Sequence, residues 1–203
     1  MKIFCVGRNY VEHARELQNE VPDEPVIFMK GPNALLKNGE ALYYPAFTKD
    51  LHYEGELVVR IAKNGKKIDE KFAHKYYNEV SLGFDFTARD LQNKLKSKGL
   101  PWELAKAFDG AAAAGQFYDK EEIRDEGRYM FSIFKNGQQV QSGNTDMMLF
   151  SIDKIISFVS RYFTLQQGDL IYTGTPAGVG AVNIGDELTG YFGDKLVVTT
   201  TVK

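Results

Sequence analysis

The sequence predicts an α+β fold that is mostly β, a β-rich roll with a few short helices. Asn-Gly pairs strongly favour tight hairpin turns, and three of them lie between apolar or alternating stretches, at 38–39, 64–65 and 136–137. Gly-Asp pairs add turn chemistry in the last third of the chain, at 168–169, 185–186 and 193–194. Strands are expected near these turns, at 170–172 and 195–202. Much of the chain should therefore be antiparallel sheet.

Helices are expected at a few places along the chain. The first spans 10–20, where Asn9 can cap the helix and Glu12 follows three residues later. The second spans 88–98, the third spans 152–162 behind Ser151, and a short one begins at Pro101, a residue that suits a first helical position. Prolines between residues 19 and 33 favour extended or irregular chain there.

Composition and charge limit the class of protein. The 203 residues are 43% hydrophobic and 26% charged, which is typical of a globular domain and excludes disordered and collagen-like chains. The chain holds 25 Lys and Arg residues against 27 Asp and Glu residues, for a net charge of −2, with no basic block. We therefore expect neither nucleic acid nor an anionic membrane as a partner.

Cysteine usage and hydropathy indicate the compartment. Cys5 is the single cysteine of the sequence, so it cannot form an intramolecular disulfide or a thiolate metal site. The apolar run behind the first two residues is too short for a signal-peptide core, and no stretch of 18 apolar residues occurs. These features predict a soluble, cytoplasmic protein.

Two glutamates lie on one face of an expected strand at 51–61. Apolar residues and Gly55 alternate there with His52, Glu54, Glu56 and Arg60. Residues two apart on a strand point the same way and lie about 7 Å apart, so both carboxylates should project into one region beside His52. If that region is solvent, the segment is a wet polar face that binds nothing.

A third carboxylate favours a metal site. Asp85 lies between two phenylalanines in a second strand-like segment, and an acid in such surroundings needs a partner. Three carboxylates without a cysteine match a hard divalent cation, Mg²⁺, Mn²⁺ or Ca²⁺, with water or substrate completing the coordination. If His52 were a ligand, Zn²⁺ or Fe²⁺ would compete; otherwise it supports the ligands from behind or simply ends a strand.

Five motifs in this order carry a family resemblance: GRNY at 7–10, HYEGEL at 52–57, DFTARDLQ at 85–92, WELAK at 102–106 and TGTPAGVG at 173–180. Together they resemble the fumarylacetoacetate hydrolase family, and the short length is similar to its acylpyruvase and oxaloacetate decarboxylase members. The resemblance covers nearly the whole chain. It implies a mixed β-sandwich roll, a Mg²⁺ or Mn²⁺ site and a homodimer. It also implies a single catalytic domain over 1–203, whose first 30 residues include a short helical lid.

The resemblance assigns roles by position. It makes Glu54, Glu56 and Asp85 the metal ligands, the same three residues that the carboxylate pattern singles out. It makes His13 and Glu16 a pair that activates water; on the sequence alone they belong to a solvated helix face. Lys106 matches an active-site lysine, although the residue type by itself indicates a surface lysine. The resemblance also places five residues in the substrate pocket: Arg8, Lys30, Arg89, Gln92 and Thr175.

The implied substrate is a small 2-oxo acid. Its 1-carboxylate and 2-oxo oxygens would chelate the metal, and the metal charge would stabilise a pyruvate enolate. In hydrolysis of a 2,4-dioxo acid such as fumarylpyruvate or acetylpyruvate, Glu16 orients His13, which takes a proton from the attacking water. Cleavage of the C–C bond then gives pyruvate and a carboxylic acid, while Lys106 adds positive charge. Acylpyruvate hydrolysis is the main functional prediction.

Three alternatives stay open. The same chelate supports decarboxylation or keto-enol tautomerisation of oxaloacetate, because both pass through an enolate. It also supports isomerisation or decarboxylation of 2-hydroxyhepta-2,4-diene-1,7-dioate. The third alternative is not an enzyme: a β-roll whose carboxylates hold a structural Ca²⁺. A structural ion would take much of the stability with it when chelated, whereas a catalytic one would leave the fold standing.

Overall fold

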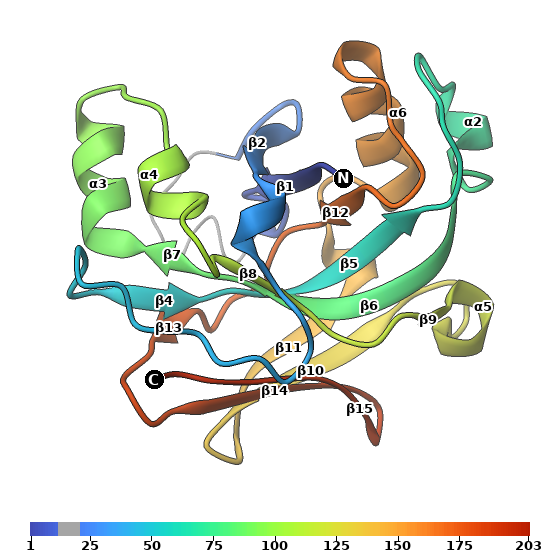
Figure 1. The fold of residues 1–203 in the computed structure, drawn as a ribbon. Coiled ribbons are helices and arrows are strands. Elements are labelled where there is room, and N and C mark those ends of the chain that lie inside the picture. Colours follow the sequence, from blue (N-terminus) through green and yellow to red (C-terminus); the bar gives the residue numbers. More distant parts are fainter. Residues whose placement is uncertain (12–20) are drawn as a thin grey trace.

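The structure is a computed structural model that describes residues 1–11 and 21–203. Most of the helix expected at 10–20 therefore lies outside the described residues. In the described part, a large sheet forms the centre of the molecule, a four-stranded sheet covers one side of it, and helices stand on the other (Figure 1). None of the described helices has the length and apolar character needed to cross a membrane.

The large sheet has the order β2-β1-β12-β5-β6-β8-β3, and β9 pairs with β6. Most neighbours are antiparallel, as expected, but β1 pairs with β12 and β3 with β8 in parallel. The N-terminal strand thus joins a strand from the last third of the chain. The bounds are β1 (Ile3–Gly7), β2 (Val26–Lys30), β3 (Leu35–Leu36), β5 (Gly55–Ile61), β6 (Tyr77–Asp85), β8 (Ala112–Ala114), β9 (Tyr118–Asp119) and β12 (Leu170–Tyr172).

Two smaller sheets complete the roll. The four-stranded sheet has the order β11-β10-β14-β15 and packs on the large sheet through β6. Its strands are β10 (Met130–Lys135), β11 (Gln138–Asn144), β14 (Glu187–Phe192) and β15 (Lys195–Thr201). The three-stranded sheet has the order β13-β4-β7, with β4 (Leu51–Tyr53), β7 (Thr87–Ala88) and β13 (Gly180–Ala181).

The expected helices after residue 87 are confirmed. They are α3 (Arg89–Ser97), α4 (Glu103–Lys106) and α6 (Ile152–Tyr162), the last begun by Ser151, whose side chain accepts a hydrogen bond from the Lys154 backbone N–H. Two unpredicted helices, α2 (Glu70–Ala73) and α5 (Lys120–Ile123), each follow an aspartate cap, Asp69 or Asp119. Two 3₁₀ turns occur as well, η1 (Pro32–Ala34) and η2 (Thr145–Met147).

One of the three Asn-Gly pairs closes a hairpin in the described structure. Asn136 and Gly137 join β10 to β11 with φ angles of 52° and 77°. The hairpin prediction was wrong for the other two pairs. Their backbone groups form hydrogen bonds with segments far away in the sequence instead of joining two neighbouring strands. Gly39 donates its N–H to the Thr199 carbonyl at 3.0 Å, and Gly65 pairs with Leu165.

The strand expected at 51–61 is interrupted at its first glutamate. The chain leaves β4 at Tyr53, passes through Glu54 and enters β5 at Gly55. The half-buried pattern is also not observed, because Glu54 is 6% and Glu56 2% exposed. Both carboxylates therefore face the interior of the protein instead of solvent.

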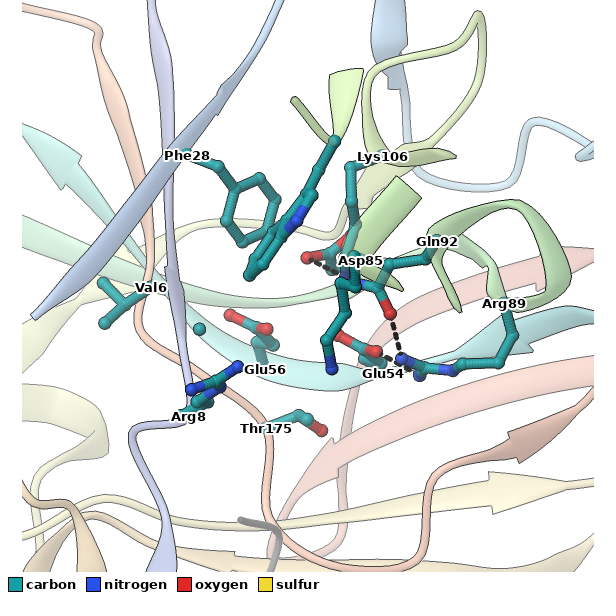
Figure 2. Close-up of a pocket in the computed structure, with 13 residues that line it drawn as sticks. Val6, Arg8, Phe28, Glu54, Glu56, Asp85, Arg89, Gln92, Lys106 and Thr175 are labelled. Carbon is teal, nitrogen blue, oxygen red and sulfur yellow. Dashed lines mark hydrogen bonds and ion pairs between the residues drawn. The ribbon is translucent and has the colours of Figure 1, made fainter. Parts of the chain in front are cut away.

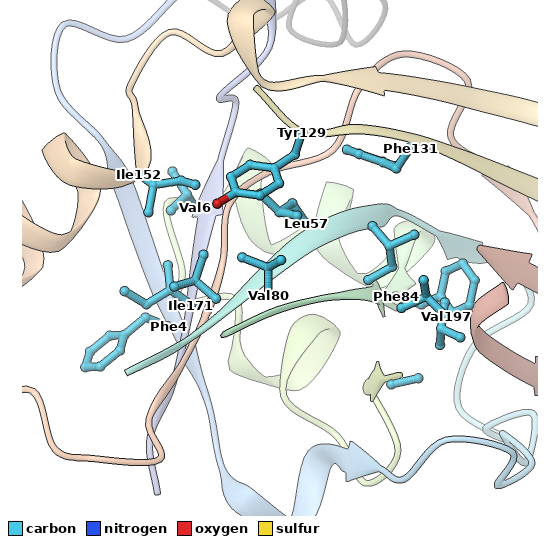
Figure 3. Close-up of a cluster of buried hydrophobic side chains, with 14 of the residues drawn as sticks. Phe4, Val6, Leu57, Val80, Phe84, Tyr129, Phe131, Ile152, Ile171 and Val197 are labelled. Carbon is cyan, nitrogen blue, oxygen red and sulfur yellow. The ribbon is translucent and has the colours of Figure 1, made fainter. Parts of the chain in front are cut away.

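The main hydrophobic core fills the space between the two larger sheets and continues beneath α6 (Figure 3). Phe84 of β6 meets Val197 of β15 between the sheets, whereas Ile171 of β12 and Ile152 of α6 lie at the other end. The main core thus packs against one face of β5 and β6. The opposite face carries a smaller apolar cluster around Val58 and Tyr172 and, at the end of these strands, the polar site described next.

The close packing around Gly83 of β6 provides a test of this arrangement. Gly83 lies opposite Glu56 in the β5–β6 ladder, and a Cβ there would stand 2.4 Å from the Ala113 carbonyl oxygen. We expect Gly83→Ala to lower the free energy of unfolding in urea by about 1–3 kcal/mol, because backbone must shift. Gly7→Ala is the control, since its Cβ would meet neighbours at 3.8 Å or more. Equal stabilities of the two variants would contradict the prediction.

Candidate functional site

Three buried carboxylates converge at the junction of β4, β5 and β6. The ladder pairs Gly55 with Phe84 and Glu56 with Gly83, so the same register sets Glu54 opposite Asp85. The Asp85 N–H donates to the Glu54 carbonyl at 2.8 Å. Because alternate strand residues share a face, all three carboxylates project to one side. Their ligand oxygens lie within 4.8 Å of one another.

The glycine between the two glutamates faces the other way. A Cβ on Gly55 would stand 2.4 Å from Ile133 Cγ1 in the four-stranded sheet and 2.9 Å from Gln141 Oε1. The Gln141 side chain also accepts a hydrogen bond from the Gly55 N–H at 2.9 Å. The Glu-Gly-Glu pattern therefore places two acids in the site while its middle residue lies tight against the second sheet.

Three cationic side chains contact the cluster. Lys106 Nζ lies 2.8 Å from Glu54 Oε2 and 3.0 Å from Asp85 Oδ2. Arg89 Nη2 lies 2.5 Å from Glu54 Oε1, and Lys30 Nζ lies 2.7 Å from Asp85 Oδ1. Lys106 and Arg89 approach the carboxylates from α4 and α3 (Figure 2). The charges of Glu54 and Asp85 are thus compensated within the protein.

Burial and mutual repulsion shift the ionisation of the cluster. The pKa of Glu56 is raised well above its ordinary value, first by burial and then by the negative charges of Asp85 and Glu54. A hydrogen bond from the Gly174 N–H at 2.7 Å opposes this shift in the Glu56 pKa. Burial lowers the pKa of Lys106, but Asp85 and Glu54 outweigh burial and raise it. Lys106 therefore carries its positive charge at neutral pH.

The donor set fits a hard divalent cation. The cluster offers three carboxylate oxygens within reach of one ion, and neither histidine nor cysteine belongs to it among the described residues. Such an all-oxygen set suits Mg²⁺, Mn²⁺ or Ca²⁺ better than Zn²⁺. A bound cation would also relieve the repulsion that raises the Glu56 pKa. Glu54, Glu56 and Asp85 are thus a metal-binding candidate.

His52 stands apart from this cluster. Its Nε2 lies 2.8 Å from Asp50 Oδ1, and its side chain is 20% exposed. Burial, followed by the positive charge of Arg89, lowers the pKa of His52. In the described structure it belongs to β4, the central strand of the three-stranded sheet, and does not line the pocket above the carboxylates.

Lys30 lies behind the cluster and not in the pocket. Its side chain is 0% exposed, and its ammonium contacts Asp85 and the carbonyl oxygens of Phe86, Lys106 and Ala111. All of its donor capacity is therefore used inside the protein. The predicted substrate contact at Lys30 does not match this placement, which fits a residue that positions Asp85.

The other predicted substrate residues do line the pocket. Arg89 Nη1 donates to Gln92 Oε1 at 2.6 Å, which turns the Gln92 amide nitrogen away from the arginine. The Thr175 hydroxyl donates to the Gly55 carbonyl at 2.8 Å and accepts from Gln141 Nε2 at 2.8 Å. The full lining is Val6, Gly7, Arg8, Phe28, Glu54, Glu56, Asp85, Arg89, Gln92, Lys96, Trp102, Lys106 and Thr175.

Sequence reasoning missed several of these residues. Lys96 lies on the same face of α3 as Arg89 and Gln92, because residues three or four apart in a helix are neighbours. This spacing could have predicted Lys96 from the sequence. Phe28 and Trp102 form an aromatic wall with ring centroids 5.9 Å apart, and no local pattern connects them. His13 and Glu16, the predicted water-activating pair, lie outside the described residues.

The buried lysine behind the cluster yields a stability prediction. Lys30→Met removes one of the two ammonium groups that pair with the buried Asp85 and leaves only Lys106. We therefore expect the free energy of unfolding of the metal-free protein to fall by about 3–5 kcal/mol in urea. Exposed Lys37 provides the control, and Lys37→Met should change stability by about 0.5 kcal/mol or less. Adding Asp85→Asn to Lys30→Met should restore part of the loss. A loss below about 1 kcal/mol for Lys30→Met would show that this ammonium is dispensable.

Sequence comparisons now place the chain among known proteins. The family profile described as "Fumarylacetoacetate (FAA) hydrolase C-terminal" matches residues 2–202. A mitochondrial oxaloacetate tautomerase of Bos taurus is 45% identical over 186 residues, covering 92% of this chain and 84% of the relative. A mitochondrial oxaloacetate decarboxylase of Dictyostelium discoideum is 41% identical over 185 residues, covering 91% and 85%. Because these relatives are mitochondrial, the cytoplasmic location stays a prediction.

Solved structures agree with the sequence comparisons. Fumarylpyruvate hydrolase from Pseudomonas aeruginosa, in complex with Mn²⁺ and pyruvate, is 36% identical with a TM-score of 0.93, covering 100% of this chain and 89% of that one. A 5-carboxymethyl-2-hydroxymuconate delta-isomerase from Mycobacterium smegmatis is 31% identical with a TM-score of 0.87, covering 99% and 77%. The predicted fold class is confirmed. Sequence and architecture together establish that this chain belongs to the fumarylacetoacetate hydrolase family.

Proposed function

We propose that this chain is a divalent-metal-dependent enzyme that interconverts the enol and keto forms of oxaloacetate, with decarboxylation of the same acid as a related activity. The observation that carries the proposal is the buried carboxylate trio, faced by Lys106 at the bottom of a cation-lined pocket. Relatives named for oxaloacetate tautomerisation and decarboxylation support this choice of substrate. This alternative therefore replaces acylpyruvate hydrolysis as the main functional hypothesis.

Glu54, Glu56 and Asp85 are the proposed ligands of Mg²⁺ or Mn²⁺. When bound, such an ion supplies Lewis-acid stabilisation of negative charge on the 2-oxygen of a 2-oxo acid. Mn²⁺ is the ion in the related fumarylpyruvate hydrolase structure, which supports this choice of metal. The resemblance of the chain to its family also leads us to propose a homodimer.

The residues around the three carboxylates have separate roles in this proposal. The Lys106 ammonium places a fixed positive charge beside the acids, where negative charge develops as a proton leaves C3 of the substrate. Arg89 holds Glu54 on one side and Gln92 on the other, which orients both. No acceptor among the described residues pairs with the Gln92 amide nitrogen, so this group can donate to a substrate oxygen. Lys30 positions Asp85 from behind.

Acylpyruvate hydrolysis is the second candidate. It is favoured by the 36% identical fumarylpyruvate hydrolase, whose structure contains pyruvate, the product that this reaction would release. Hydrolysis needs an activated water in addition to the enolate chemistry, and His13 with Glu16 is the proposed pair for that step. Tautomerisation of oxaloacetate needs no such water. The two candidates therefore differ in their dependence on His13.

An enol-decay assay tests the main proposal. Purified protein with Mg²⁺ should accelerate the loss of oxaloacetate enol absorbance, and chelation should abolish the effect. Asp85→Asn should lower kcat/KM by about 100-fold or more, because one proposed ligand loses its charge. Exposed Glu187→Gln is the control and should behave as the parent protein does.

The same assay separates the candidates. Acetylpyruvate and fumarylpyruvate are run in parallel, with pyruvate release as the readout for hydrolysis and for decarboxylation. The tautomerase proposal would be overturned in favour of hydrolysis by two results together: metal-dependent pyruvate release from the acylpyruvates, and oxaloacetate enol decay that is no faster with the protein than without it. His13→Ala should then abolish that release.

A thermal melt tests whether the metal is structural. Because Lys30, Lys106 and Arg89 already compensate the buried acids, we expect chelated protein to keep its folded circular-dichroism spectrum and a cooperative transition. Added Mg²⁺ should raise Tm in a concentration-dependent way, as expected for a ligand that binds the folded state. Loss of the folded spectrum on chelation would instead support the structural-cation alternative.

A further inference from the structure

Arg8 is a cation of the pocket that forms no ion pair with the three carboxylates. It follows β1 directly, is half-buried and lines the same pocket as the three acids. Lys106 and Arg89 each pair with a carboxylate of the trio, but no carboxylate in residues 1–11 or 21–203 pairs with Arg8. In the view of Figure 2 the two glutamates lie between Arg8 and Arg89.

The backbone holds Arg8 in an unusual conformation. Its φ is 60°, a left-handed value that is uncommon for a residue with a side chain. The neighbouring Asn9 is fully buried and anchors this bend: its amide donates to the Thr173 carbonyl at 2.7 Å and to the Phe150 carbonyl at 3.0 Å. Strained backbone of this kind is maintained where the surrounding structure fixes it, and it clusters at functional sites.

Lys96 adds a second cation to the same region. It lines the pocket from α3, on the helix face that also carries Arg89 and Gln92. Burial lowers the pKa of Lys96, and the positive charges of Arg8 and Arg89 lower it further. Lys96 and Arg8 thus both contribute positive charge to the lining of the pocket.

The pocket therefore presents two kinds of charge to a substrate. The carboxylate trio suits a cation, and through it the 1-carboxylate and 2-oxo group of a 2-oxo acid. The positive charges of Arg8 and Lys96 suit a further negative charge. We propose that Arg8 and Lys96 form a subsite for the second carboxylate of a 2-oxo dicarboxylic acid. This subsite makes the enzyme selective for dicarboxylates over 2-oxo monocarboxylates, an inference that rests on the proposed function.

A matched pair of substrates isolates that carboxylate. Oxaloacetate and its C4 amide, 2-oxosuccinamate, have nearly the same shape and differ by one negative charge. With Mg²⁺ present, the parent protein should prefer oxaloacetate in kcat/KM by about 10- to 100-fold, the range expected for charged hydrogen bonds. Dissociation constants for both ligands, measured by calorimetry on Mn²⁺-loaded protein, provide a readout that needs no turnover.

Variants then assign the preference to residues. Arg8→Asn removes the charge, and asparagine tolerates the positive φ, so kcat/KM and affinity for oxaloacetate should fall by about 10- to 100-fold while those for the amide stay constant. Arg8→Lys should keep part of the preference. Lys96→Gln should reduce it without affecting folding, and exposed Lys94→Gln on the same helix should leave it unchanged. Melting temperatures confirm that each variant is folded.

Failure of the subsite and failure of the proposed function are distinguishable. If the parent protein acts on oxaloacetate but shows no preference over the amide, or if Arg8→Asn and Lys96→Gln weaken both ligands equally, the subsite is overturned and the tautomerase proposal stands. If the parent protein acts on neither ligand yet binds oxaloacetate more tightly through Arg8, the tautomerase proposal is overturned and the carboxylate subsite stands.

Discussion

The structure depends on one electrostatic constraint: three carboxylates are held together away from water. Repulsion and burial both oppose this arrangement, as the raised pKa of Glu56 indicates. Three cations counter it, and each comes from a different element: Lys30 from the end of β2, Arg89 from the start of α3 and Lys106 from α4. The N-terminal strands and the central helices are thus tied to the β5–β6 junction by charge.

The fold satisfies this constraint with two closely packed sheets. Gly55 marks a contact point between them, because a side chain there would clash with Ile133 and Gln141 of the four-stranded sheet. The acids occupy the opposite face of β5 and β6 and line the pocket. On that face Gly83 leaves room for the backbone of β8. The apolar core on one side of β5 and β6 therefore fixes the backbone that carries the acids on the other side.

The cations of the pocket divide into two sets. Lys106 and Arg89 pair with the acids, and under the proposed function they serve the enolate chemistry common to tautomerisation, decarboxylation and hydrolysis. Arg8 and Lys96 line the same pocket, and under the proposed subsite they bind the second carboxylate of the substrate. The two proposals therefore assign reaction type and substrate choice to different residues.

The sequence by itself determined the local features. Period-two alternation placed Glu54 and Glu56 on one side of a strand, and Asp85 stood out as an acid between phenylalanines. Local signals predicted helices at 88–98 and 152–162, which the structure places at 89–97 and 152–162, because such signals act within a few residues. The family motifs added Lys106 and the mixed β-sandwich architecture.

Only the tertiary structure decided the long-range features. It set Asp85 opposite Glu54, buried both glutamates, placed Lys30 behind the cluster and brought Lys96 and Arg8 into one pocket. It also left a single Asn-Gly pair as a hairpin among the described residues, because Gly39 pairs with Thr199 and Gly65 with Leu165, far along the chain. Each of these outcomes depends on contacts between segments that are remote in sequence, and no local pattern records them.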